Sequence, residues 1–174
     1  MKRLIVIYFS HQGEEYNKDH FEVLKEGFTA HLAKEISSLL KSHIFEIKMV
    51  HPYPVSYKEC LALGQEDLQK NSPVELEKTK LDLKAFDGII LGYPIWFGSF
   101  PQPVKVFLNE HKDEVKDIYP FITSGGGTPA HSLDDLASSC PKAQIHPALS
   151  LVGSSLDKDD EQIKNWLTKN NLIN

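Results

Sequence analysis

Residues 88–98 read Gly-Ile-Ile-Leu-Gly-Tyr-Pro-Ile-Trp-Phe-Gly, and this stretch decides the fold. Its first residues form a short apolar run that is typical of a buried strand. A bend follows, and Pro101 and Pro103 then mark the start of a helix. Trp96 and Phe97 therefore lie in a loop at a strand end, where an exposed aromatic ring can support a flat ligand. The segment contains no nucleophile paired with a base and no metal ligands at usable spacing, so we expect a bound ring to carry the chemistry.

Similar patterns on both sides of this stretch predict an alternation of strands and helices. Strand patterns occur at residues 4–9, 44–49, 88–91, 118–122 and 143–149. Helical spacing of apolar residues occurs at about 28–40, 56–69, 103–110, 132–139 and 157–169, the last with Asp157 as its cap. Such alternation predicts one parallel sheet with helices on both faces and right-handed crossovers. Ligands of these sheets bind beyond the carboxyl ends of the strands.

The composition is that of an ordinary globular protein. The chain has 174 residues, of which 41% are hydrophobic and 25% charged, so we expect a single domain over residues 1–174. A net charge of -5 and a pI near 5.9 disfavour nucleic acid and anionic membranes as partners. The apolar run after Lys2-Arg3 is too short for an export signal, and no run is long enough to span a membrane, so we expect a cytoplasmic protein. Cys60 and Cys140 form no disulfide framework or zinc pattern and are assigned no role.

Three loops follow strand ends and are expected to form one crevice. The first, Ser10 to Gly13, is rich in polar donors and leads through Gly27-Phe28-Thr29 to a helix N-terminus, which favours an anion. This pattern indicates a phosphate site without a Walker lysine. Alternatively, Ser10 and Thr29 are an ordinary turn residue and helix N-terminal residue. The residues between, 14–25, have mixed charge and form either a solvated face or a flap over a ligand.

The second and third loops would hold a ring. In the second, Pro94 to Gly98, the aromatic residues form a platform, although most Trp and Phe residues are simply core residues. In the third, Thr123 to Gly127, three successive glycines leave backbone groups open to the polar edge of a planar ligand. A flexible loop without function is the alternative for the third segment.

These segments resemble the strand and loop signatures of flavodoxin-like proteins. The resemblance lies in Tyr8-Phe9-Ser10, Gly92 to Gly98, Pro101-Gln102-Pro103 and Ser124 to Gly127, and it spans nearly the whole chain. It implies an α/β three-layer sandwich whose five-stranded parallel sheet has the order 2-1-3-4-5, with helices on both faces. It also implies FMN as a non-covalent cofactor. By the resemblance, five residues surround the phosphate: Ser10, His11, Phe28, Thr29 and Ala30. Ten residues would hold the ring: Pro94, Ile95, Trp96, Phe97, Gly98, Thr123, Ser124, Gly125, Gly126 and Gly127.

The first loop departs from the family pattern. Flavodoxins usually carry a Thr-Gly-Asn-Thr type of loop directly after the first strand, whereas here an insertion separates Ser10 from Gly27-Phe28-Thr29. Phe28 stands where asparagine is expected.

The resemblance implies an electron-transfer flavoprotein that serves a redox partner protein. An FMN-dependent NAD(P)H:quinone-type oxidoreductase is the alternative. A flavin-free binding or regulatory module on the same fold is a third possibility, because the phosphate loop is altered. Either a monomer or a homodimer is compatible with the motifs. A hydrolase is disfavoured because His11, His131 and His146 have no serine or cysteine in an elbow-like turn nearby.

Overall fold

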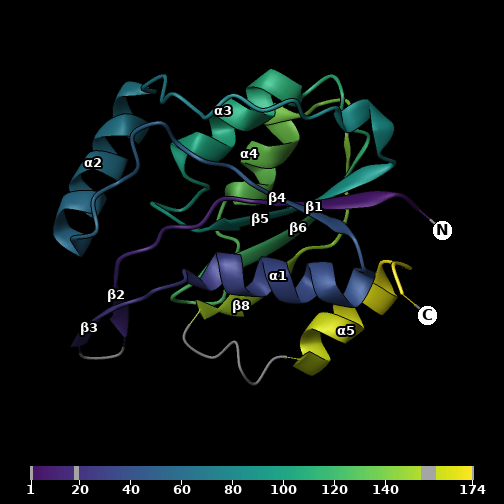
Figure 1. The fold of residues 1–174 in the computed structure, drawn as a ribbon, viewed down its shortest axis with the longest axis horizontal. Helices are drawn as coiled ribbons and strands as arrows, with labels where there is room; N and C mark the ends of the chain where they lie inside the picture. The colour runs from purple at the N-terminus through teal and green to yellow at the C-terminus, as the bar shows by residue number, and fades with distance from the viewer. Residues whose placement is uncertain (1, 18–19, 154–159, 174) are drawn as a thin grey trace.

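A parallel β-sheet forms the centre of the computed structural model, which describes residues 2–17, 20–153 and 160–173 (Figure 1). Its strands are β1 (Leu4–Tyr8), β4 (His43–Glu46), β5 (Gly88–Pro94), β6 (Asp117–Ser124), β7 (Gln144–Ile145) and β8 (Leu149–Val152). They lie in the order β4-β1-β5-β6-β7, and β8 also pairs with β6. The helices are α1 (Phe28–Leu40), α2 (Tyr57–Lys70), α3 (Gln102–His111), α4 (Ser132–Ser139) and α5 (Asp160–Lys169), with a short 3-10 helix at Leu83–Ala85.

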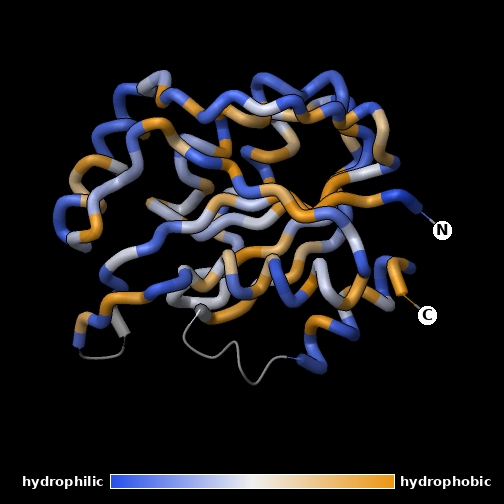
Figure 2. Tube along the Cα trace, in the orientation of Figure 1, coloured by the Kyte–Doolittle hydropathy of each residue, from blue (hydrophilic) through white to orange (hydrophobic). Residues whose placement is uncertain are grey.

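Alternate side chains of the central strands enter two separate hydrophobic cores. In β1, Ile5 and Ile7 belong to one core, with buried residues of α2, α3 and α4. Val6 and Tyr8 belong to the other, with buried residues of α1 and α5. Figure 1 shows these two groups of helices on opposite faces of the sheet, and Figure 2 shows hydrophobic residues concentrated along the strands between them. The predicted three-layer α/β sandwich is therefore confirmed. None of the described helices combines the length and apolar character needed to cross a bilayer.

The fifth predicted strand differs from the observed one. Residues 143–149 were expected to form one strand, but β7 and β8 are two short segments that pair with different parts of β6. Pro147 lies between them and has no N–H group for the ladder. Its carbonyl oxygen accepts a hydrogen bond of 2.7 Å from Trp166 Nε1 in α5. The order 2-1-3-4-5 thus holds with a divided fifth strand. The predicted cap of the last helix, Asp157, lies outside the described residues.

The second predicted strand is also shorter than expected. Residues 44–49 alternate as a strand, but β4 ends at Glu46. Beyond it the chain runs beside the segment at Glu75 and Leu76, and the Val50 N–H donates to the Glu75 carbonyl oxygen at 2.9 Å. Met49 and Leu76 form an isolated antiparallel bridge. The alternation of apolar and polar residues therefore continues past the end of β4, because the segment at Glu75 and Leu76 pairs with residues 49 and 50.

The insertion after β1 contains an antiparallel hairpin. Strands β2 (Glu14–Asn17) and β3 (His20–Val23) form it, and its base is closed by a hydrogen bond of 2.9 Å from Leu24 N–H to the Gly13 carbonyl oxygen. The Glu14 N–H donates to the Val55 carbonyl oxygen at 2.8 Å, in the loop that precedes α2. The hairpin is thus fixed beside the N-terminus of α2, which Figure 1 places at the same end of the molecule.

Gly92 allows β5 and β6 to pack around a buried aromatic ring. It pairs with Phe121 on β6, and a Cβ atom at position 92 would lie 2.0 Å from Cζ of that ring. Phe121 is fully buried in the core shared with α1 and α5. The ring thus occupies the space that a side chain at position 92 would need.

We expect Gly92→Ala to lower the free energy of unfolding by about 1–3 kcal/mol, because the added methyl group overpacks the core. Gly126→Ala is the control, since a Cβ there meets no heavy atom of the described residues within 4 Å. Urea denaturation of both variants measures the difference. Equal stability of the two variants would show that Phe121 moves without cost.

Candidate functional site

A pocket of about 420 Å³ opens at the carboxyl ends of β1, β5 and β6. This volume is in the range of small-molecule sites, roughly 300–1,000 Å³. All three predicted loops contribute to its wall, with most of the predicted residues: Ser10, His11, Phe28, Thr29, Pro94, Ile95, Trp96, Phe97, Thr123, Ser124 and Gly125. Four other predicted residues lie outside the lining: Ala30, Gly98, Gly126 and Gly127. The three loops thus meet as the sequence suggested, while cofactor contact by each residue stays a prediction.

One end of the pocket carries hydroxyl groups beside the N-terminus of α1. Ser10 Oγ accepts a hydrogen bond of 3.1 Å from the Ala30 N–H, so Ala30 contributes through its backbone. Thr29 Oγ1 and Thr123 Oγ1 lie 2.8 Å apart and share a hydrogen bond. The N-cap residue of α1 is a glycine that offers no side-chain cap, and the first turn has no acidic residue. This end therefore combines neutral donors with the positive end of a helix dipole, an arrangement that suits an anion.

Phe28 has a packing role that explains the departure from asparagine. A Cβ atom on Gly153 would lie 2.4 Å from Cδ2 of the Phe28 ring, so the ring rests on the backbone that follows β8. Both residues line the pocket. Phe28 thus closes this end of the pocket with an apolar wall instead of adding a polar group.

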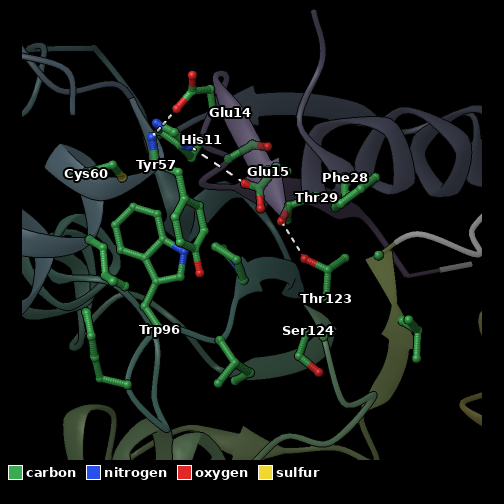
Figure 3. Close-up of a pocket in the computed structure, with 18 residues that line it drawn as sticks. His11, Glu14, Glu15, Phe28, Thr29, Tyr57, Cys60, Trp96, Thr123 and Ser124 are labelled. Atoms are coloured by element: carbon green, nitrogen blue, oxygen red, sulfur yellow. Dashed lines mark hydrogen bonds and ion pairs between the residues drawn. The ribbon is translucent and has the colours of Figure 1, made fainter. Parts of the chain in front are cut away.

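Aromatic residues form the opposite end (Figure 3). The Trp96 ring makes edge contacts with Phe9, Tyr53 and His11, at centroid distances of 5.8, 5.2 and 5.9 Å. A Cβ atom on Gly64 of α2 would lie 3.3 Å from the Trp96 ring. Trp96 therefore packs on the core and lines the pocket at once, so the two interpretations of this residue are compatible.

Phe97 and Gly98 form a tight turn between Trp96 and Ser99. The Trp96 N–H donates to the Ser99 carbonyl oxygen at 2.8 Å, and the Ser99 N–H donates back at 3.1 Å. The φ angles are +52° at Phe97 and +83° at Gly98, as in a type I′ turn. A Cβ at Gly98 would lie 2.5 Å from Cε1 of His131, so Gly98 shapes the turn without lining the pocket. Asparagine usually precedes glycine in such turns, and an aromatic residue there is strained.

His11 lies at the aromatic end, although the resemblance assigned it to the phosphate (Figure 3). Its Nε2 donates to the Pro54 carbonyl oxygen at 2.9 Å, and its Nδ1 is 3.7 Å from Oε1 of Glu15. Burial disfavours the charged ring, but the contacts with Cys60, Glu15 and the Pro54 carbonyl outweigh it and raise the pKa of His11 to about 10. His11 therefore joins the aromatic wall to the hairpin and to the loop before α2.

The pocket also contains residues that the sequence did not indicate. They come from the hairpin, from α2, and from the last residue of β8 and the residue that follows it: Glu14, Glu15, Tyr57, Cys60, Leu61, Val152 and Gly153. Glu14 Oε2 accepts a hydrogen bond of 2.8 Å from the Tyr57 N–H, which fixes β2 against α2. Cys60, which was assigned no role, faces His11 inside the pocket. The sequence analysis anticipated the hairpin part of the pocket only through the alternative that residues 14–25 form a flap over a ligand. No motif indicated that α2 contributes.

We expect Phe97→Asn to separate folding from ligand binding. Asparagine tolerates a positive φ, so the free energy of unfolding should stay within about 1 kcal/mol of the parent value. Affinity for FMN, the ligand that the resemblance implies, should fall about tenfold because the ring is lost from the platform. Lys41→Asn is the control, since Lys41 has a similar φ of +50° at the end of α1. Calorimetry of unfolding and fluorescence titration with FMN give the two quantities. Unchanged FMN affinity in Phe97→Asn would remove this residue from the site.

Comparison with known proteins agrees with this architecture. A family model described as Flavodoxin matches residues 20–170. No curated protein matches the chain. A candidate flavoprotein from Bacteroides eggerthii DSM 20697 has a similar structure, with a TM-score of 0.72, 20% identity, and coverage of 97% of this chain and 98% of that one. A flavoprotein in complex with FMN, from Lactobacillus acidophilus NCFM, has a TM-score of 0.68 and 19% identity, and covers 91% of this chain and 98% of its own. These structural similarities show the fold, and the family match covers most of the sequence. The chain therefore belongs to the flavodoxin family.

Proposed function

We propose that this protein binds FMN non-covalently and transfers electrons through it. The observation that carries the proposal is one pocket that has a hydroxyl end suited to an anion and an aromatic end. It lies at the carboxyl ends of the parallel strands, where the strand order reverses between β1 and β5. The family match and the FMN complex of the structurally similar Lactobacillus protein support the choice of ligand. When bound, the flavin supplies the redox chemistry, and the protein supplies binding and orientation.

The residues present fit the parts of FMN. Ser10, Thr29 and the N-terminus of α1 would hold the phosphate, and Trp96 and Phe97 would hold the ring. A Cβ atom at Gly125 would meet no heavy atom of the described chain within 4 Å, so the backbone there is open to the polar edge of a ring. Each part of the cofactor thus has a chemically suitable wall.

The charges of the pocket favour an electron carrier over an enzyme that uses NAD(P)H. The lining residues that the structure describes include two glutamates, Glu14 and Glu15, and neither lysine nor arginine. NAD(P)H carries several phosphate charges, which arginine and lysine ordinarily bind. With a net charge of -5, the chain suits a redox partner protein that has a basic surface. We place this exchange in the cytoplasm.

Visible absorption spectra test the proposal directly. The purified protein is measured before and after addition of FMN, and then after anaerobic addition of NADH or NADPH. We expect flavin bands that persist with the nicotinamide nucleotides and bleach with dithionite. Prompt bleaching by NADH or NADPH would instead identify an oxidoreductase. Absence of flavin binding would leave a binding or regulatory module on the same fold.

A comparison of FMN with riboflavin tests the phosphate end by itself. We expect Ser10→Ala to weaken FMN binding about tenfold, because a hydroxyl donor and the cap of Ala30 are both lost, and to leave riboflavin binding unchanged. Ser56→Ala is the control, since the Ser56 hydroxyl also accepts from a backbone N–H in the first turn of a helix, that of Glu59 in α2. It should not change the ratio of the two affinities. An equal loss of FMN and riboflavin binding in Ser10→Ala would show that the phosphate does not bind at Ser10.

A further inference from the structure

We propose that His11 is a fixed positive charge in the pocket wall and that it makes the protein bind reduced FMN more tightly, relative to oxidised FMN, than it otherwise would. The inference rests on the proposed function for its ligand. It concerns a side chain whose contacts differ from those that the family resemblance implied, because His11 lies with the aromatic wall and away from the hydroxyl end (Figure 3).

The contacts of His11 favour protons on both ring nitrogens. The Pro54 carbonyl oxygen, 2.9 Å from Nε2, can only accept a hydrogen bond. The Glu15 carboxylate, 3.7 Å from Nδ1, attracts a second proton to the opposite side of the ring. A ring with both nitrogens protonated is an imidazolium. Because both N–H groups face protein oxygens, His11 acts on a ligand through its charge and does not supply a proton.

The ring is also held in place. The side chain of His11 is only 7% exposed. Gly13 packs against it so closely that a Cβ atom there would lie 2.7 Å from Cε1 of His11 and 2.7 Å from the Val55 carbonyl oxygen. The His11 imidazolium therefore cannot turn away from the pocket when a ligand binds.

Of the residues that the structure describes, two ionisable groups face His11 from the neighbouring elements: Glu15 from β2 and Cys60 from α2. The nearby Glu14 carboxylate accepts the Tyr57 N–H at the start of α2 and is directed there. These contacts agree with the raised pKa of His11, about 10, so the ring stays charged throughout the neutral range.

The charge has a directional effect on a redox cofactor. Among the described lining residues, His11 is the one side chain that brings a positive charge to the pocket. Reduction adds electrons to a flavin, so a fixed cation in its site stabilises the reduced form more than the oxidised form. Glu15 offsets part of this effect, and a charge at a partly buried site still changes a binding ratio by about tenfold.

The test measures dissociation constants for oxidised and for reduced FMN, the latter under anaerobic conditions. In His11→Gln we expect the ratio of the reduced to the oxidised constant to rise about tenfold. His43→Gln is the matched control, because exposed His43 starts β4 at the opposite end of the sheet. The ratio there should equal that of the parent. An equal change of both constants in His11→Gln would reduce His11 to a structural residue and overturn the proposal.

Nuclear magnetic resonance of the imidazole, with and without FMN, supplies a reading that needs no redox chemistry. The His11 signals should show no titration between pH 6 and 8.5. Glu15→Gln should bring the titration into this window and make the affinity ratio depend on pH, even if His11→Gln fails to fold. Titration of parent His11 below pH 8.5 would overturn the proposal. If the parent binds no FMN, the proposed function fails, while the titration still decides whether the charge exists.

Discussion

Two backbone hydrogen bonds just beyond the strand ends hold the pocket together. The Phe9 N–H donates to the Gly92 carbonyl oxygen at 3.0 Å, and the Ile95 N–H donates to the Thr123 carbonyl oxygen at 2.9 Å. They continue the parallel register of β1 with β5 and of β5 with β6. Because parallel strands end at the same edge, three loops distant in sequence become neighbours. The hydroxyl end and the aromatic end of the pocket depend on this alignment.

The loop after β5 has a strained backbone that hydrogen bonds and ring contacts hold in place. Phe97 has a positive φ that an aromatic residue rarely adopts, and the hydrogen bonds between Trp96 and Ser99 hold it there. Trp96 in turn is braced by Phe9, Tyr53 and Gly64. A rigid platform of this kind orders little upon ligand binding, so less conformational entropy is lost.

The hairpin gives this pocket a wall of its own. Its first strand brings Glu14 to the N-terminus of α2 and Glu15 to His11, so two carboxylates fasten the insertion to the elements around the aromatic end. The same contacts keep His11 inside the wall, away from the hydroxyl end. The departure from the compact family loop therefore changes more than the hydroxyl end, because it adds charged groups beside the aromatic end.

The sequence by itself determined the fold class, the three loops and most of the pocket lining, because apolar periodicity and turn residues act over a few neighbours. The glycine and aromatic signature at residues 92–98 was enough to indicate a flat ligand. Tertiary structure alone decided the rest. The last strand is divided at Pro147, whose carbonyl oxygen accepts a hydrogen bond from Trp166 of α5 instead of from a neighbouring strand. Cys60, Tyr57 and Glu15 enter the site because the hairpin docks on the loop before α2. The partners of His11 lie on separate elements, and the charge of a buried ring depends on those partners, which no local pattern of residues encodes.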